Sequence, residues 1–528
     1  MYDNDLNNNP VNYIGRRTLY TDVEEVTDKN VKQILRDVIN LHEVNRQQMT
    51  FLLEYEGGNQ PLKRVKTVRP DIDIHDIDNV ANEITNFKRS YHWGNPITLV
   101  QRGNVDSGSE IEPKAIALLN ECFSAENVRK KTAELSRYVE ITGVGYTALE
   151  LNTRWKEGKS PFTYSVIDPR YAFVVRSSRY ADHRVMVGVT YRVDSFGNRY
   201  FTAITENRVY IVKNLVQTIN GEPLKEEIWT WGDRSGEPNP FGMINIIEWV
   251  RDVDRMGCFE RQIPEMDALN IIESDFANDV DQNTQAIWHA NDVEPPKDEN
   301  GNDIVASSGQ WIYTETTMNG KTPFVKPLTI GYDYGGMLNN VISKRQLILQ
   351  KCNVPQRNDN SGGSTGVAMS DATGWTQAEV EATKIQGLQE DSKMQEVEVA
   401  LEIIKLSPYV PQDSPLRELR YVDVKPNVKR QKTYEMTTKI NAYATGVAHG
   451  IAPEHMIYAI NFFDDPQQVV DDSKEYLDLY INSVFKSDNS EVVPDGAEGE
   501  PSVNRERLAQ DESDQQGNSP MIDGMRTE

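Results

Sequence analysis

The sequence has few of the features that mark secreted, membrane-spanning or disulfide-rich proteins. Only three cysteines occur in 528 residues, Cys122, Cys258 and Cys352, and their wide separation excludes a disulfide framework and fits synthesis in a reducing cytoplasm. No run approaches about eighteen consecutive apolar residues, so we expect no membrane contact through a spanning helix. The N-terminal residues are polar and acidic, and they lack the basic start and apolar core of a secretory signal.

Positive charge is also scarce. The formal net charge is -25, whereas a protein that grips duplex DNA in a groove should be basic. Two interpretations stay open. The acidic surface serves general solubility, or it lines a passage through which DNA moves without sticking.

Two short motifs match the letters of catalytic loops but lack their context. Gly158-Lys159-Ser160 resembles the end of a phosphate-binding loop, but Thr153 stands where a glycine is needed and Pro161 disfavours the helix that should follow. The run 362–366 reads G-x-S-x-G, but a polar segment precedes it instead of the buried strand of a nucleophile elbow. We therefore interpret 362–366 as a flexible linker.

No metal or cofactor site is indicated. The two histidines nearest to each other in the C-terminal part, His449 and His455, do not have the H-E-x-x-H spacing of a zinc site. Acidic pairs such as Asp279 with Asp281 and Asp252 with Asp254 suit a divalent cation, acid and base catalysis or ordinary solvation, and solvation is the simpler reading in so acidic a chain. We expect no cofactor, no bound metal and no enzymatic activity.

Hydrophobic periodicity predicts an α+β fold. Apolar residues recur at helical spacing in the first 142 residues, which predicts helices at about 28–55, 80–91, 113–122 and 125–142. Short apolar runs separated by turns then predict strands at 145–151, 162–167, 172–175, 186–193, 200–205, 208–212, 227–231 and 244–249. Further helices are expected at about 264–287, 334–352, 375–406, 434–447, 453–461 and 466–485, with strands at 310–314, 322–326 and 419–424.

The stretch from Asp267 to Gly387 organises the rest of the chain. It begins with a strongly acidic helix whose apolar face includes Leu269, Phe276 and Ile287, and it continues through a small insert to a second helix. A glycine-rich loop and a long helix follow. Carboxylates opposite a narrow apolar stripe suit a helix in a ring around an aqueous lumen, and they suit an ordinary surface helix equally well. Arg357 and the basic cluster at 425–432 are candidate phosphate contacts, or ordinary surface charge.

Five sequence motifs occur in an order typical of one protein family. They are YEGGNQ at 55–60, YHWGNPI at 91–97, FGMINIIEW at 241–249, DALNIIESDFAND at 267–279 and VP at 354–355 followed by GSTGVA at 363–368. Asn245 replaces a usual proline, and Trp375-Thr376-Gln377 departs from the usual lysine-rich continuation. From about Lys29 to Phe485 the chain resembles the portal proteins of tailed bacteriophages of the siphovirus type.

The resemblance implies a division of the chain into named parts. These are a flexible N-terminus (1–28), an α/β wing (29–257), a first stem helix (258–287), a small α/β clip (288–331), a second stem helix (332–353), a tunnel loop (354–374), a second wing portion (375–432), helical crown (433–485) and a disordered acidic tail (486–528).

It also implies roles for individual residues. The stem acids, some of them facing the lumen, are Glu273, Asp275, Asp279 and Asp281. The DNA-facing residues of the tunnel loop are Arg357, Asn358, Asn360, Gly362, Gly363, Ser364 and Thr365. The possible phosphate contacts are Lys425, Lys429, Arg430 and Lys432.

The resemblance further implies a dodecameric ring at one vertex of the virion capsid, assembled in the host cytoplasm. Double-stranded DNA would pass through it during packaging and ejection. Its expected partners are other copies of itself, the terminase large subunit, a head-completion or adaptor protein, and the major capsid and scaffolding proteins. The alternatives are a different ring-forming or scaffold protein of the virion and a metal-dependent hydrolase that uses paired acids.

Overall fold

The computed structural model describes most of the chain up to residue 473. The described residues are 15–62, 71–102, 113–156, 159–180, 182–219, 222–284, 287–294, 311–316, 320–328, 333–356, 374–428, 430, 435–451, 455–457, 469, 470 and 473. The chain divides into two compact units, Met1–Gln468 and Val469–Glu528, and all the named helices and strands lie in the first. The fold is α+β, as predicted.

Eight α-helices are assigned within these ranges, and most of them agree with the predicted periodicity. They are α1 (Val31–Glu56), α2 (Val80–Trp93), α3 (Pro113–Ala125), α4 (Val128–Thr142), α5 (Ile263–Thr284), α6 (Tyr334–Lys351), α8 (Trp375–Leu406) and α9 (Glu435–Ala448). Three 3-10 turns accompany them, at Glu260–Gln262, Pro415–Arg417 and Tyr421–Asp423. Over the described part of the chain, no helix is both long enough and apolar enough to cross a membrane.

The strands form four separate sheets. They are β1 (Leu19–Thr21), β2 (Thr98–Gln101), β3 (Val144–Leu151), β4 (Phe162–Ile167), β5 (Ala172–Ser177), β6 (Val185–Val193), β7 (Arg199–Ile204), β8 (Arg208–Ile219), β9 (Glu222–Trp231), β10 (Glu237–Pro238), β11 (Ile246–Val250), β12 (Ile287–Asn291), β13 (Trp311–Thr314), β14 (Phe324–Leu328) and β15 (Val424–Asn427). The largest sheet has the order β1-β5-β6-β7-β8-β10, with β9 also paired to β8. The smaller sheets have the orders β11-β3-β4, β13-β12-β14 and β15-β2.

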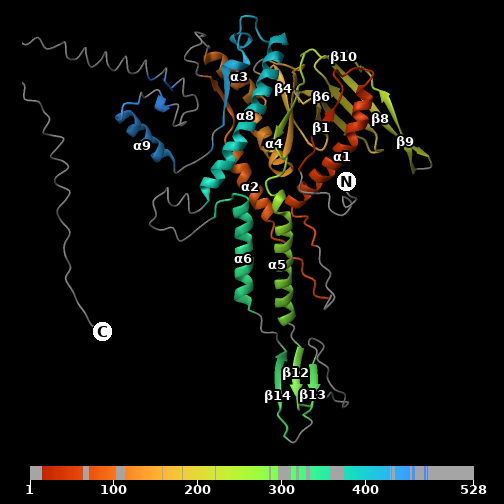
Figure 1. Cartoon of the computed structure of the whole chain (residues 1–528), viewed down its shortest axis with the longest axis vertical. Coiled ribbons are helices and arrows are strands. Elements are labelled where there is room, and N and C mark those ends of the chain that lie inside the picture. The colour runs from red at the N-terminus through yellow and green to blue at the C-terminus, as the bar shows by residue number, and fades with distance from the viewer. Residues whose placement is uncertain are drawn as a thin grey trace, which may run out of the picture. The chain divides into compact units, whose positions relative to one another are not determined.

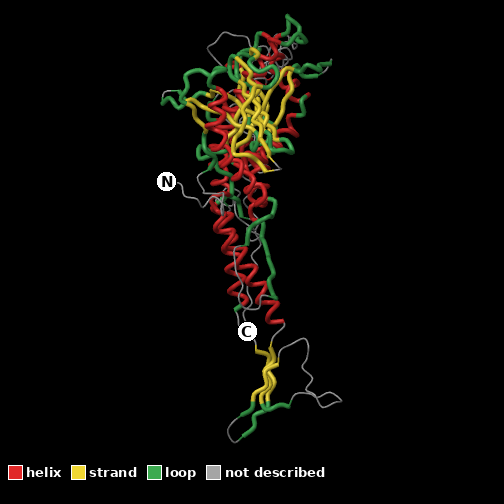
Figure 2. Tube along the Cα trace, turned by 90° about the vertical axis from the view of Figure 1, so that its right-hand side faces the viewer, coloured by secondary structure: helices red, strands yellow, loops and turns green. Residues whose placement is uncertain are grey.

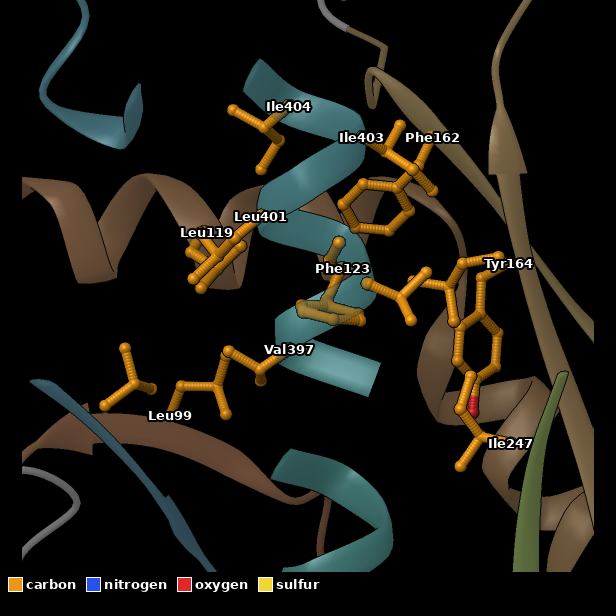
Figure 3. Packing of buried hydrophobic residues seen from close by; sticks show 14 of the residues in the cluster. Leu99, Leu119, Phe123, Phe162, Tyr164, Ile247, Val397, Leu401, Ile403 and Ile404 are labelled. Carbon is orange, nitrogen blue, oxygen red and sulfur yellow. The ribbon is translucent and has the colours of Figure 1, made fainter. Parts of the chain in front are cut away.

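Two hydrophobic clusters hold the sheets against helices. One face of α1 presents Val31, Leu35 and Val38 at helical spacing, and these side chains pack on the largest sheet. The second cluster joins α8 and α3 to the β11-β3-β4 sheet. Figure 3 shows Leu401 and Val397 of α8 in this cluster, with the aromatic rings of the strand residues nearby. Because α8 is buried along its second half, it is a core helix rather than a surface helix.

Three predictions about the elements were wrong. Residues 15–28 were assigned to a flexible N-terminus, but β1 pairs in parallel with β5, and a Cβ added to Gly15 would lie 1.8 Å from the carbonyl oxygen of Asp254. The first stem helix ends at Thr284, and Ile287 begins β12 instead of extending the apolar face of α5. The segment 419–424 is mostly a turn, and the strand there is β15, which pairs with β2.

Candidate functional site

Helices α5 and α6 form an antiparallel pair. At one end Glu265 of α5 forms an ion pair with Lys351 of α6, and farther along the pair the rings of Phe276 and Tyr334 meet edge to face, with centroids 5.9 Å apart. The two helices lie side by side, and the β13-β12-β14 sheet lies between them in sequence (Figures 1 and 2). The predicted order of helix, small insert and helix is therefore present.

An extended segment, residues 71–79, lies along α5, and we name it the strap. Three buried polar side chains of α5 hold it, Asn270, Ser274 and Asn278, each less than 4% exposed. Their oxygens accept the backbone N–H groups at strap positions 78, 76 and 74, at 3.1, 2.9 and 2.8 Å respectively. Four helical residues rise about 6 Å and two extended residues about 6.6 Å, so the two repeats stay in register.

The sequence contained a signal for the strap, because Asn270, Ser274 and Asn278 recur at four-residue spacing within the motif at 267–279. Short polar side chains are uncommon in the apolar stripe of a helix unless they have hydrogen-bond partners. The family pattern alone did not predict that these three side chains form a ladder, meaning a regular series of hydrogen bonds to the backbone of the strap.

The four predicted stem acids lie in different environments. Asp275 is exposed, and Asp279 and Asp281 are partly exposed. Glu273 is half-buried beside the strap. Burial raises the pKa of Glu273, and Asp78 and Asp76 of the strap raise it further, to about 7, although Arg345 of α6 opposes this shift. Arg345 forms ion pairs with strap residue Asp78 and with Glu83 of α2.

A buried ionic network joins the end of α6 to α2, α4 and α8, and we name it the junction network. Arg251 bridges two carboxylates, with its Nε 2.9 Å from Glu140 and its guanidinium paired with Glu381. The Lys88 Nζ lies 2.5 Å from Glu381, and the Asn353 side-chain amide donates to the same carboxylate at 3.0 Å. Burial alone would raise the pKa of Glu381, but Lys88 and Arg251 hold it below its ordinary value.

The junction network fixes one end of the predicted tunnel loop. Asn353 has a left-handed backbone, with φ of 52°, and its carbonyl oxygen accepts a hydrogen bond from Lys88 at 3.3 Å. At the other end Gly374 has φ of 87° and precedes α8, and the Tyr91 hydroxyl donates to Glu379 of α8 at 2.5 Å. Helix α2 therefore contacts both ends of the loop, through Lys88 at one end and Tyr91 at the other.

The DNA-facing residues predicted within that loop remain predictions. Residues 357–373 lie outside the described residues. The predicted DNA-facing residues among them are Arg357, Asn358, Asn360, Gly362, Gly363, Ser364 and Thr365. The interpretation of the G-x-S-x-G run at 362–366 as a flexible linker also lies outside the described residues and stays a prediction.

The predicted basic cluster is described at two positions. Lys425 is exposed on β15. The side chain of Arg430 is largely buried, and it forms an ion pair with Glu379 and a hydrogen bond to Gln386, both on α8. Arg430 therefore holds α8 in addition to any contact with phosphate. Lys429 and Lys432 lie outside the described residues.

A groove of about 400 Å³ lies where α6 ends and α8 begins. Its lining includes four cations, Arg251, Arg261, Lys351 and Lys384, and two carboxylates, Asp252 and Glu381. Val380 also lines it and is 57% exposed. Three of the four cations are already paired with carboxylates: Arg251 with Glu140 and Glu381, Arg261 with Asp254, and Lys351 with Glu265.

The small sheet has one strongly apolar face. The strand register places Trp288, Ala290, Trp311, Tyr313 and Val325 on the same side. The rings of Trp288 and Trp311 stack with centroids 5.8 Å apart. Trp288, Tyr313 and Val325 are each about 40% exposed.

The described residues contain no group of three or more His, Cys, Asp or Glu side chains that could hold a metal ion. After Lys159 and Ser160 the chain enters strand β4 rather than a helix, so the geometry of a phosphate-binding loop is missing at this site. In the acidic pair of Asp252 and Asp254, Asp254 forms an ion pair with Arg261.

Comparison with known protein families gives one match over most of the chain. The family described as phage portal protein, SPP1 Gp6-like, matches residues 36–479. No curated protein matches the chain. The matched range contains α5, the β13-β12-β14 sheet, α6 and α8.

Proposed function

Because the chain belongs to the phage portal protein family, we propose that it forms a ring-shaped channel at one capsid vertex, through which double-stranded DNA is packaged, retained and ejected. Portal proteins are virion components that serve DNA packaging, and they are structural proteins rather than enzymes. The observation that carries the proposal is the family match over residues 36–479.

We assign the parts of the portal to the observed elements. Helices α5 and α6 are the stem, the β13-β12-β14 sheet is the clip, and the elements before α5 together with α8 and β15 are the wing. The segment between Gln356 and Gly374 is the tunnel loop, and α9 begins the crown. This assignment is supported by the antiparallel pairing of α5 and α6 and by the small sheet that lies between these two helices in sequence.

The charge of α5 suits a channel wall. This helix carries six carboxylates and no cation, and Asp275 is exposed on it. A carboxylate near DNA phosphate is repelled rather than bound, so an acidic wall lets the duplex slide. We propose that Asp275, Asp279 and Asp281 contribute to this wall, whereas Glu273 lies against the strap.

The proposed partners follow from the same assignment. The clip would meet the terminase large subunit during packaging and a head-completion or adaptor protein afterwards, and the wing would meet the major capsid and scaffolding proteins. The apolar face that contains Trp288 and Trp311 supports a docking function for the clip, because exposed aromatic residues are enriched at interfaces. We propose a twelve-membered ring that assembles in the host cytoplasm.

Negative-stain electron microscopy and light scattering of the purified protein test the ring directly. We expect a ring with an axial hole and a mass several times that of the 60.1 kDa chain. A stable monomer would contradict the proposal. A metal-dependent hydrolytic activity of such a monomer would favour the enzyme alternative.

Deletion of residues 356–366 tests the loop. We expect rings that assemble normally but heads that fill poorly or lose their DNA, as measured by the DNA content of particles from a portal-deficient phage complemented with the variant. Normal filling and retention would favour a ring or scaffold protein that does not act on DNA.

A further inference from the structure

A furrow of about 370 Å³ lies between α2 and α4 and has no assigned function. The two helices pack against each other, and each lines the furrow with residues at three- and four-residue spacing, within 86–93 on α2 and 129–136 on α4. None of the described residues that line it is acidic, although the chain has a net charge of -25. We name it the arginine furrow, after Arg89 and Arg129 in its lining.

Both arginines carry a positive charge that no described carboxylate neutralises. The Arg89 guanidinium donates to the carbonyl oxygen of Ala133 at 3.1 Å and to the hydroxyl oxygen of Ser136 at 3.3 Å, so it meets only neutral acceptors. Arg129 is exposed, and its side chain forms no ion pair with any described residue. By contrast, three of the four cations in the groove at the end of α6 are ion-paired. The charge of the arginine furrow is therefore available to a ligand.

The start of α4 adds to this excess of positive charge. Arg129, Lys130 and Lys131 lie in its first turn, which contains no acidic residue. The aligned N–H groups of a helix carry partial positive charge at this end, so cations there are unfavourable and anions are favourable. Lys131 pairs with Glu126, but Lys130 is exposed and forms no ion pair with any described residue. A bound anion would offset a repulsion that the described residues relieve only at Lys131.

The remaining polar side chains of the lining indicate which class of anion fits. Hydroxyl and amide groups accompany the arginines, and they belong to Asn86, Ser90, Thr132 and Ser136. Arginine together with Ser, Thr and Asn is the set of side chains that contacts phosphate oxygens in protein–DNA complexes. Protein interfaces are usually anchored by aromatic side chains in addition to arginine, whereas Trp93, the aromatic residue of this lining, is 7% exposed. The lining therefore favours phosphate over the carboxylates of a protein partner.

The arginine furrow is separate from the loop between Gln356 and Gly374. Lys88 and Tyr91 of α2 hold the two ends of that loop. Successive residues are about 100° apart around a helix, so these two side chains leave α2 on the side opposite to the furrow. We propose that the arginine furrow binds phosphate groups in the backbone of duplex DNA, as a second DNA contact that does not involve the loop. This inference rests on the proposed function, which brings DNA to the protein.

Removal of both guanidinium groups tests the proposal. Fluorescence anisotropy measures the binding of a short labelled DNA duplex to purified rings from about 50 to 200 mM salt. Each phosphate contact contributes about 0.9 to the slope of log affinity against log salt concentration, so Arg89→Gln with Arg129→Gln should reduce the slope by at least about 1.8. Binding at about 50 mM salt should weaken at least about tenfold. The loss should be the same for duplexes of different sequence, because phosphate contacts read no bases.

Arg89 also joins α2 to α4, so further variants separate binding from folding. Arg129→Gln alone removes a side chain that forms no ion pair with any described residue, and it should still reduce the slope by about 0.9. Arg89→Lys with Arg129→Lys keeps both charges but lacks the guanidinium fork. This variant should keep the wild-type slope and bind DNA more weakly than wild type, but more tightly than the double glutamine variant.

A matched control removes two cations elsewhere on the surface, Lys405→Gln with Arg420→Gln. Both residues are exposed and belong to local pairs with Glu402 and Asp423. This control changes the net charge as the double arginine variant does, and its slope should match that of wild type. An equal loss of slope in the control would show a general charge effect and would overturn the proposal.

Competition distinguishes the possible sources of the anion. Polyglutamate and inorganic phosphate should displace the duplex no better than chloride at equal ionic strength. Stronger displacement by polyglutamate would assign the furrow to an acidic protein, and stronger displacement by inorganic phosphate would assign it to free phosphate. Either result would overturn the assignment to DNA.

Deletion of residues 356–366 tests whether the furrow acts without the loop. In rings with this deletion, the double glutamine variant should lose the same amount of slope, because separate sites contribute independently. Loss of the arginine effect in these rings, an unchanged slope in the double variant, or no DNA binding by wild-type rings would overturn the proposal. If the wild-type chain forms no ring at all, the proposed function fails, whereas rings whose salt dependence ignores these arginines overturn only this inference.

Discussion

The body of the protein, meaning the elements before α5 together with α8 and β15, differs from the α5–α6 helix pair in how completely one chain buries its apolar residues. Helix α1 buries residues along its whole length, from Val31 to Tyr55. The buried residues assigned to α6 are Ile348 and Leu349, both near the end that joins the body, whereas Leu338, Ile342 and Leu347 are 43–50% exposed. The body therefore buries its apolar side chains within one chain, whereas α6 leaves several apolar side chains exposed.

Polar interactions show the same contrast. The body contains carboxylates that are fully buried and paired, such as Glu140 with Arg251. Glu396 is also fully buried, and it accepts hydrogen bonds from Thr147 and Tyr164 and pairs with Lys393. On α5, by contrast, Asp275 is exposed. Buried pairs need fixed geometry to offset their desolvation, so they occur where the fold is rigid.

The largest expected effect comes from the junction network. Arg251→Met leaves Glu140 and Glu381 buried without their shared cation, and loss of one partner from a buried ionic group costs about 3–5 kcal/mol. The same substitution in the exposed pair of Arg420 and Asp423 should cost about 0–1 kcal/mol. Urea unfolding followed by circular dichroism measures both. Equal losses would show that the network does not stabilise the body.

Two leucines compare the body with the α5–α6 pair directly. Leu401 of α8 is 2% exposed, and Leu401→Ala should lower the free energy of unfolding by about 2–5 kcal/mol because it leaves a cavity. Leu338 of α6 is 50% exposed, and Leu338→Ala should cost the isolated chain about 0.5 kcal/mol or less. If a neighbouring copy covers α6, Leu338→Ala should instead weaken ring formation, as sedimentation velocity would detect. A large monomer effect for Leu338 would contradict the contrast.

The smallest effect concerns Glu273. Its pKa is raised from the ordinary value of 4.5 to about 7 in the folded protein, so the folded state binds the proton more tightly and stability falls as pH rises from about 4.5 to 7. Glu273→Gln should remove this fall and stabilise the chain slightly at pH 7.5, by less than about 1 kcal/mol because solvent screens a half-exposed group. The thermal midpoints of both proteins at pH 5 and pH 7.5 provide the measurement. If Glu273→Gln raised the thermal midpoint more at pH 5 than at pH 7.5, this prediction would be wrong.

Elements with strong periodicity could be predicted from the sequence. The long helix α8 and strand β4 have the predicted bounds, because each shows several apolar residues at one clear spacing. Strand β1 was missed because its three residues give no periodicity and its stability comes from pairing with β5, about 150 residues away. Strand β12 was missed because its apolar residues follow α5 closely and continue the helical pattern.

The candidate site was predictable in part, for a similar reason. The order of acidic helix, insert, second helix and loop is local information and was predicted. The strap and the junction network depend on contacts between distant residues, such as Lys88 with Glu381, and no spacing within one segment encodes them. The ladder of Asn270, Ser274 and Asn278 is the exception, since its four-residue repeat is visible in the sequence.

The fixed ends of the segment between Gln356 and Gly374 have a consequence for how this protein can vary. Asn353 and Gly374 set the direction of the chain at either end, and the junction network and the Tyr91 contact hold both ends to the body. Closing a longer loop between fixed ends costs little, about 0.6 kcal/mol for each doubling of length. A change in the length of this segment should therefore cost little folding stability, and the helices on either side can keep their positions.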